Sequence, residues 1–163
     1  MITFKKVKVC FLLIFVLINI FYIEPCYSLS SREDFFRNAL DLSSAGKFNL
    51  ALQEWNRYLD AYPDDAAGLS NRGNVRLVIG DAEGSIDDQN KAIKLNPSEI
   101  DPYINRGIAE EALGLWSKAR KDYMFVISKD SKNFSALYNL ANVEGSTSQW
   151  DKARDLFSKA ALY

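Results

Sequence analysis

The chain of 163 residues repeats itself with a period of about 34 residues, and few folds accommodate such a period. The tripeptide Asn-Arg-Gly begins at Asn71 and again at Asn105. Residues that lie one period apart form a column of equivalent positions. Three such columns contain only small residues, and two others contain mostly aromatic residues. These columns are Ala39, Gly73, Gly107 and Ala141; Gly46, Gly80, Gly114 and Ser148; Ala51, Ser85, Ala119 and Ala153; Phe48, Ala82, Trp116 and Trp150; and Trp55, Gln89, Tyr123 and Phe157. Four units without a gap follow, at 32–65, 66–99, 100–133 and 134–163.

Each unit has the pattern of two helices joined by a turn. In the second unit, 70–80 lacks proline and ends at Gly80, and 82–97 has apolar residues at helical spacing and stops at Pro97. Small residues at Gly73 and Gly107 allow the two helices of a unit to cross closely, and aromatic residues fill the space beside the crossing. One helix pair cannot bury its apolar face alone, so the units must stack on one another.

This pattern of small and aromatic columns, with Pro63 and Pro97 also one period apart, covers residues 32–163 and resembles the tetratricopeptide repeat (TPR) family. The resemblance implies an all-α fold, a right-handed α-solenoid of four helix-turn-helix units with a concave groove. It also implies a protein or an extended peptide as partner and no catalysis.

A narrower resemblance links this chain to exported TPR proteins of cyanobacteria and chloroplasts. It rests on the stretches NRGNVRL at 71–77, DAEGSIDDQNKAIKLNPSEIDPYINRGIAEEALGLW at 81–116 and SALYNLANVEGSTSQWDKARDLF at 135–157. It implies a location in the periplasm or the thylakoid lumen and a role near membrane-associated photosynthetic complexes.

The segment 1–28 has the order of a secretory signal peptide. A basic start with Lys5, Lys6 and Lys8 precedes an uncharged run at 9–23, and Cys26 and Ser28 have the spacing of a cleavage site. We expect cleavage after Ser28, leaving the TPR domain at 29–163. An uncleaved anchor is the alternative, although spanning a bilayer takes about 20 apolar residues. In that case the protein would contact the membrane only through this segment.

The composition argues against an enzyme, a metal site and a nucleic-acid binder. The chain has no histidine, and both cysteines precede the expected cleavage site, which removes the commonest nucleophile pairs and metal ligands. Glu110 and Glu111 are adjacent, so on a helix they point about 100° apart and cannot act as a carboxylate pair. Asp87 and Asp88 are predicted to face solvent. The net charge of −1 does not favour nucleic acid, and we expect no cofactor.

One column of asparagines is the main candidate for binding. Asn71, Asn105 and Asn139 are spaced by one repeat period, and Asn74 and Asn142 form a partial second column. An amide side chain can pair with the main chain of any extended peptide. Glycosyltransferases with long TPR arrays resemble this chain in carrying such an asparagine ladder. The alternative is that each asparagine bonds to the neighbouring repeat and only fixes packing.

Charged residues stand where the TPR family usually has apolar ones, and buried charges must be paired. We therefore predict an ion network between repeats, with Arg76 near Glu110 and Arg106 near Glu144. Arg106 could also pair with Glu110 one turn away. The full set is Arg72, Arg76, Arg106, Glu110 and Glu144.

The expected groove surface mixes amides with apolar side chains. It contains Phe36, Leu40, Asn74, Leu77, Ile104, Ile108, Tyr138 and Asn142. It lacks the set of lysines and arginines with which chaperone-binding TPRs hold a terminal carboxylate, which argues against that class. The last unit is shorter than a full period, so a partner or a second copy could cover the C-terminal end, with Leu162 and Tyr163 as a self-made cap otherwise. A permanent structural subunit of a membrane-associated assembly is the alternative function.

Overall fold

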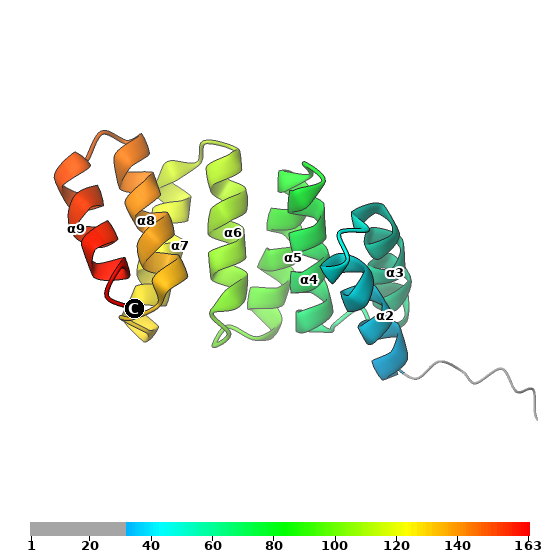
Figure 1. Ribbon diagram of the computed structural model, residues 1–163. Coiled ribbons are helices and arrows are strands. Elements are labelled where there is room, and N and C mark those ends of the chain that lie inside the picture. Colours follow the sequence, from blue (N-terminus) through cyan, green and yellow to red (C-terminus); the bar gives the residue numbers. More distant parts are fainter. Residues whose placement is uncertain (1–31) are drawn as a thin grey trace, which may run out of the picture. The chain divides into compact units, whose positions relative to one another are not determined.

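The structure is a computed structural model that describes residues 32–163, and these residues contain eight α-helices and no β-strand (Figure 1). The expected all-α solenoid is confirmed. The expected signal peptide or anchor at 1–28 lies outside the described residues. The helices, which form four successive pairs, are α2 (Arg32–Ser44) and α3 (Phe48–Ala61), α4 (Ala66–Val78) and α5 (Ala82–Leu95), α6 (Asp101–Ala112) and α7 (Trp116–Lys129), and α8 (Phe134–Ser146) and α9 (Trp150–Ala160).

The turn between the two helices of every pair contains a residue with a positive φ angle at the same position of the repeat. Gly46, Gly80 and Gly114 have φ angles of +71°, +91° and +70°, and Ser148 has φ of +62°. This left-handed conformation ends a helix and suits glycine because glycine has no Cβ to clash. Ser148 therefore adopts the turn that the other three units make with glycine.

The helices α4, α5 and α8 each begin at a capping side chain. Asp65, Asp81 and Asn133 accept hydrogen bonds from the backbone N–H of Gly68, Gly84 and Ala136, respectively. These bonds satisfy an N–H group that a helix start leaves without a partner.

The two helices of a pair cross closely at the glycine of Asn-Arg-Gly, as predicted. A Cβ added to Gly73 would lie 2.6 Å from Nε2 of Gln89, and one added to Gly107 would lie 2.6 Å from the Tyr123 ring. Gln89 and Tyr123 are fully buried and belong to the predicted column of large side chains. The glycine therefore makes room for the large residue of the second helix.

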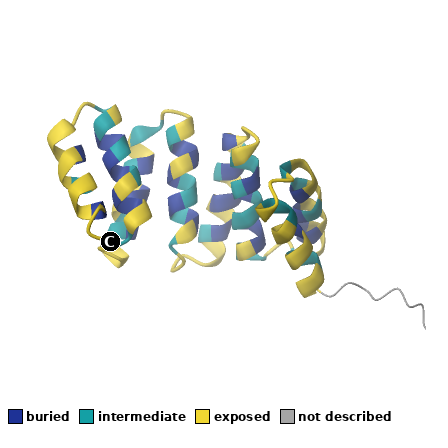
Figure 2. Ribbon diagram, in the orientation of Figure 1, coloured by how far each residue is buried: buried dark blue, intermediate teal, exposed yellow. Residues whose placement is uncertain are grey.

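Buried residues line the faces at which the helices meet, and the outward faces are exposed (Figure 2). One apolar cluster is centred on Trp55 and Tyr58 of α3, and another on Tyr123 and Val126 of α7. Trp150, expected to fill space beside its crossing, is instead 69% exposed. It stands at the first residue of α9, the last described helix, which packs mainly against α8.

Candidate functional site

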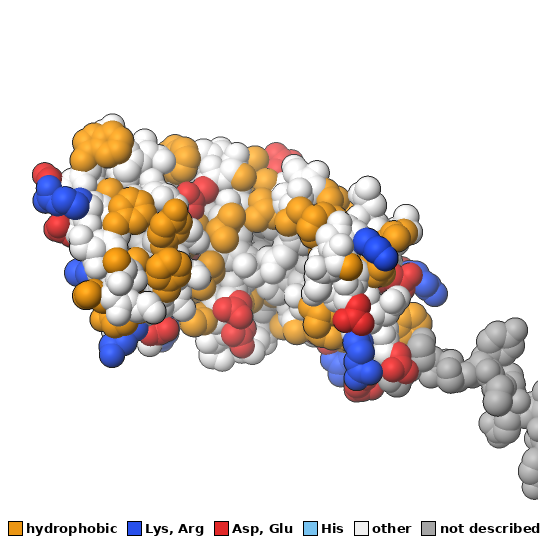
Figure 3. Space-filling model, viewed as in Figure 1, with side chains coloured by type: hydrophobic (Ala, Val, Ile, Leu, Met, Phe, Trp, Pro, Cys, Tyr) orange, Lys and Arg blue, Asp and Glu red, His pale blue; other side chains and the backbone are white. Residues whose placement is uncertain are grey.

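A cleft of about 310 Å³ opens between the second and third helix pairs. Figure 3 shows the face on which α4, α6 and α8 lie in front, and this face is hollowed in its middle. The residues that line the cleft, which we call the central cleft, are Ala66, Ala67, Ser70, Asn71, Asn74, Ala92, Asn96, Glu99, Asp101, Pro102 and Asn105. Three of the five predicted groove asparagines thus share one site.

A second cleft adjoins the central cleft through the same asparagines. It measures about 260 Å³ and lies between the first and second helix pairs. Ser43, Ser44 and Phe48 line it on one side, and Asn71, Asn74, Val75 and Val78 on the other. Asn71 and Asn74 therefore stand between two hollows, where a bound chain could contact them from either side.

The asparagines of the central cleft keep part of their hydrogen-bonding capacity. Nδ2 of Asn71 donates to the Ala67 carbonyl at 2.9 Å, and Nδ2 of Asn105 donates to Oγ of Ser70 at 3.3 Å. Within residues 32–163, nothing donates to the side-chain oxygens of Asn71 and Asn105. Each of these amides therefore offers an acceptor to a ligand, while the Asn105 bond also links two repeats.

The remaining asparagines have different surroundings. Oδ1 of Asn74 accepts from Nε2 of the buried Gln89 at 3.4 Å. Asn139 and Asn142 lie on α8, do not line the central cleft, and make no side-chain hydrogen bond within the described part of the chain. The five predicted groove asparagines therefore divide into one shared site, formed by Asn71, Asn74 and Asn105, and a separate half-buried pair on α8.

Of the predicted apolar groove residues, Ile104 is buried in the core and Phe36 is half-buried against it. Ile104 is only 9% exposed and packs in the cluster with Tyr123, and Phe36 packs edge-on against Trp55 at 5.0 Å between ring centres. The prediction that Ile104 lines the groove surface was wrong, because its side chain is buried in the core. Ile108 is 37% exposed, four residues after Ile104. A step of four residues turns a helix about 40° past a full turn, which is enough to move a side chain out of the core.

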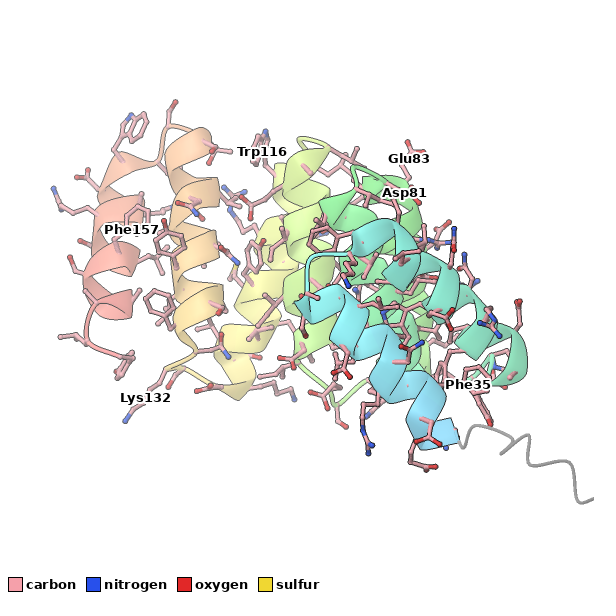
Figure 4. All side chains as sticks on the ribbon, turned by 45° about the vertical axis from the view of Figure 1, so that its right-hand side comes forward. Phe35, Asp81, Glu83, Trp116, Lys132 and Phe157 are labelled. Atoms are coloured by element: carbon pink, nitrogen blue, oxygen red, sulfur yellow. The ribbon has the colours of Figure 1, made fainter. Side chains whose placement is uncertain are left out.

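Aromatic side chains gather on the same face over α8 and α9. Phe134 and Tyr138 stack with ring centres 5.8 Å apart, and Tyr138 meets the edge of Phe157 at 5.4 Å. All three are exposed, and hydrophobic atoms cover this part of the surface in Figure 3. Figure 4 shows Phe157 on α9, the helix that carries this surface with α8. We call Phe134, Tyr138 and Phe157 the aromatic surface.

The edge of the central cleft carries negative charge. Glu99 and Asp101 line it, and its lining contains no lysine or arginine. Neither carboxylate takes part in an ion pair within the described residues. In Figure 3, acidic atoms lie at the lower edge of the hollow, and lysine and arginine atoms lie toward the two ends of the described chain.

The buried ion pairs form mainly within repeats, which corrects the predicted network. Arg72 donates to both carboxylate oxygens of Asp88 at 2.8 and 2.7 Å, and Arg106 does the same to Asp122 at 2.7 and 2.7 Å. Each arginine lies on the first helix of its pair and its aspartate on the second. Asp88, predicted to face solvent, is fully buried.

Each of these arginines also reaches the preceding repeat. Nη1 of Arg72 donates to Oδ1 of Asn56 at 3.1 Å, and Nη1 of Arg106 donates to Oδ1 of Asn90 at 2.7 Å. We call the two sets arginine brackets, composed of Asn56, Arg72 and Asp88 and of Asn90, Arg106 and Asp122. Each member of the first set recurs in the second after one repeat period, a signal in the sequence that we missed.

The other charged residues of the predicted network also have unexpected partners. Arg76 pairs with Asp88 at 2.9 Å, not with Glu110. Glu144 pairs with Arg120 at 2.8 Å, not with Arg106. The Arg120–Glu144 pair does join two repeats, the third and the fourth. An arginine on a first helix is directed at the second helix of its own pair, because the close crossing brings that helix nearest.

Glu110 is buried without an ion pair among the described residues. It is 5% exposed, and its Oε2 has no hydrogen-bond partner. Burial is the main cause that raises the pKa of Glu110 to about 7, and the negative charge of Asp122 is the second cause. Burial also raises the pKa of Tyr123, whose hydroxyl donates to Glu111. The hydrogen bond to Asp122 raises the pKa of Arg106.

The described residues offer no metal site and no membrane span. Within 32–163, no group of three or more His, Cys, Asp or Glu side chains could hold a metal ion. In the same part of the chain, every helix is too short or too polar to cross a bilayer.

Residues 36–100 match the family model of the tetratricopeptide repeat. The chain is a tetratricopeptide repeat protein. It is 30% identical over 142 residues to tetratricopeptide repeat protein 6 of Homo sapiens, which is 87% of this chain and 26% of that protein. It is 32% identical over 108 residues to sperm-associated antigen 1 of Homo sapiens, which is 66% of this chain and 12% of that protein. The chain thus spans about a quarter or less of the length of these relatives.

Solved TPR structures share the fold. The crystal structure of MamA has a TM-score of 0.75 and 21% identity, and the match covers 82% of this chain and 78% of MamA. The first TPR of Spaghetti (RPAP3), solved with the HSP90 peptide SRMEEVD, has a TM-score of 0.69 and 25% identity, covering 72% of this chain and 93% of that one. The tetratricopeptide repeat is a non-enzymatic protein-interaction module, and the described residues form such a module.

Proposed function

We propose that this TPR protein binds an extended segment of a partner protein along the face formed by α4, α6 and α8. The observation that carries the proposal is the gathering of Asn71, Asn74 and Asn105 in one cleft. An extended peptide presents backbone N–H and C=O groups along its length, and each needs a partner when it leaves water. The free amide oxygens of Asn71 and Asn105 can accept from such N–H groups irrespective of the peptide side chains.

The aromatic surface extends the proposed groove toward α9. Its rings are exposed beside Asn139 and Asn142 on α8 and could receive apolar side chains of the same segment. Burying aromatic area adds affinity that amide contacts alone do not provide. The expected ligand is therefore a segment with apolar side chains as well as an extended backbone.

The charge of the cleft sets this proposal apart from one relative. The RPAP3 repeat was solved with a peptide that ends in Glu-Glu-Val-Asp. The central cleft has Glu99 and Asp101 at its edge and no lysine or arginine. Like charges repel, so we propose that this protein does not take an acidic terminal peptide of that type.

Substitution of the cleft asparagines tests the proposed groove. The partner would first be captured by crosslinking in native membranes and identified by mass spectrometry, and the crosslinked segment then made as a peptide. Asn71→Ala with Asn105→Ala should weaken binding of this peptide about tenfold, because two hydrogen bonds are lost. Asn38→Ala is the matched control, since Asn38 is exposed on α2 and lines neither cleft. Unchanged affinity together with a lower melting temperature would show that these asparagines serve packing alone.

We further propose that the protein acts after export, in the periplasm or the thylakoid lumen, where it assists assembly or maintenance of a membrane-associated photosynthetic complex. The order of residues 1–28 supports export. N-terminal sequencing of the protein from its native cells should give Leu29 as the first residue. A mature chain that begins at Met1 and is digested by protease added to the cytoplasmic side would reject export.

A permanent structural subunit is the second candidate function, favoured by the exposed aromatic side chains at α8 and α9. Trp150, Phe134 and Tyr163 are all more than half exposed. An exposed apolar group of this kind is typical of an interface. A complex of fixed stoichiometry that survives a high-salt wash would support this function. A monomer whose mass does not change with concentration would exclude self-association.

A further inference from the structure

We infer that the bound segment places a lysine or arginine side chain against Glu99 and Asp101 at the edge of the central cleft. This inference rests on the proposed peptide-binding function and adds the chemistry of the ligand. It follows from the hydrogen-bonding groups of the cleft, from the position of Glu99 in the repeat, and from the charge of the surrounding surface.

Glu99 occupies a column whose other members cap helices. The residues one period before and one period after it are Asp65 and Asn133, and both accept a hydrogen bond from a backbone N–H of the next helix. Glu99 does not do this, because α6 begins at Asp101 and its cap residue is Ile100, without a side-chain hydrogen bond. Glu99 therefore caps no helix, unlike Asp65 and Asn133, and lines the cleft instead.

Asp101 is also free of a structural partner among the described residues. It is the first residue of α6, and its side chain neither caps the helix nor joins an ion pair in 32–163. In contrast, the carboxylates of Asp88 and Asp122 are buried and bound by arginine. Asp88 and Asp122 are thus neutralised by arginine, whereas Glu99 and Asp101 at the edge of the cleft have no cationic partner within the described residues.

Several hydrogen-bond acceptors remain free in the cleft. They include the carboxylates of Glu99 and Asp101 and the side-chain oxygens of Asn71 and Asn105. A lysine ammonium carries three donors and an arginine guanidinium five, and neither has an acceptor. A cationic side chain therefore matches the charge of the cleft and the acceptors at its edge, whereas a carboxylate would be repelled by Glu99 and Asp101.

A selection from a peptide library on the full chain tests the inference. Random peptides displayed on phage would be selected on immobilised protein, and the enriched sequences counted. The same selection would use Glu99→Gln with Asp101→Asn, and a control variant with Glu83→Gln and Asp87→Asn. Glu83 and Asp87 are exposed on α5 and do not line the central cleft, so the control changes the net charge equally.

We expect peptides selected on the unchanged protein and on the control variant to be rich in lysine or arginine and poor in acidic residues. The Glu99→Gln, Asp101→Asn variant should lose this bias. Its affinity for a selected basic peptide should fall about two- to fivefold for each carboxylate, as for partly exposed ion pairs, and the difference should shrink at high ionic strength.

Two results would overturn the inference in distinguishable ways. If peptides are enriched but carry no excess of basic residues, or if both double variants lose the bias equally, the charge assignment is wrong and peptide binding stands. If no peptide is enriched above an empty surface, the proposed peptide-binding function fails and the inference fails with it.

Discussion

Arg106 holds Asp122 by two hydrogen bonds of 2.7 Å, and the same geometry recurs one repeat earlier between Arg72 and Asp88. Each arginine also donates a hydrogen bond to an asparagine of the preceding repeat, and this asparagine is the third member of each arginine bracket. A bidentate guanidinium–carboxylate contact fixes both distance and orientation. The brackets therefore fix the packing of the helices within the second and third repeats and tie each repeat to the one before it.

Removal of Asp88 should destabilise the protein strongly. Asp88→Ala leaves Arg72 and Arg76 without their shared buried partner, and the free energy of unfolding should fall by about 3 to 5 kcal/mol. Chemical denaturation followed by circular dichroism would measure this. Asp87→Ala is the control, because Asp87 is exposed and should change stability by less than about 0.5 kcal/mol. Equal effects of the two substitutions would contradict the assigned role of Asp88.

A methyl group at Gly107 should also be costly. The added Cβ would lie 2.6 Å from a ring atom of the buried Tyr123, so Gly107→Ala should lower the free energy of unfolding by about 1 to 3 kcal/mol. At Gly145 the nearest atom would be 3.6 Å away, an ordinary contact. Gly145→Ala should therefore be neutral or stabilising by up to about 1 kcal/mol, because alanine favours a helix. A stable Gly107→Ala variant would argue against the close crossing.

The turn at Ser148 offers a stabilising substitution. Ser148 holds φ of +62°, which strains a residue with a Cβ, so Ser148→Gly should raise the free energy of unfolding by about 0.5 kcal/mol. The reverse change in a sister turn, Gly80→Ala at φ of +91°, should lower it by about 1 kcal/mol. Thermal unfolding would show melting temperatures that move in opposite directions. A shift of both in the same direction would refute the assignment of this column to left-handed turns.

Glu110 should make the protein less stable as the pH rises. Its pKa in the folded protein is about 7, above the model-peptide value of 4.5, so the folded state holds the proton more tightly than the unfolded state. The favourable contribution is complete below about pH 4.5 and is lost between pH 4.5 and 7, and it amounts to about 3 kcal/mol at most. Denaturant midpoints measured from pH 5 to pH 8 should therefore decline more in the unchanged protein than in Glu110→Gln. Parallel pH profiles would show that Glu110 does not titrate in this range.

The sequence predicted the repeat and its backbone well, because these depend on residue size and on turn chemistry. Gly73 and Gly107 mark crossings and Gly80 marks a left-handed turn, and each of these needs a missing Cβ. The same information predicts Ser148 in its turn only through the register of the repeat, since serine alone does not indicate a positive φ.

The sequence predicted that Glu110 and Glu144 are buried, but it did not predict the burial of Asp88, the pairing of the buried charges or the rotation of the first helices. Asp87 and Asp88 are adjacent and chemically identical, yet one is exposed and the other is fully buried between two arginines. Ile104 and Ile108 were both assigned to the groove, although their directions differ by about 40°. Such differences depend on the angle between packed helices, which the repeat period does not specify.

The arginine brackets also affect how the central cleft meets a ligand. The column of Arg72 and Arg106 holds Asn38 in the first unit and Leu140 in the last, so the brackets belong to the two units that form the cleft. A flexible site loses entropy when a ligand orders it, and this loss weakens binding. Here the walls are already ordered when the chain folds, so a partner meets a shape that is fixed in advance and loses affinity mainly through its own ordering.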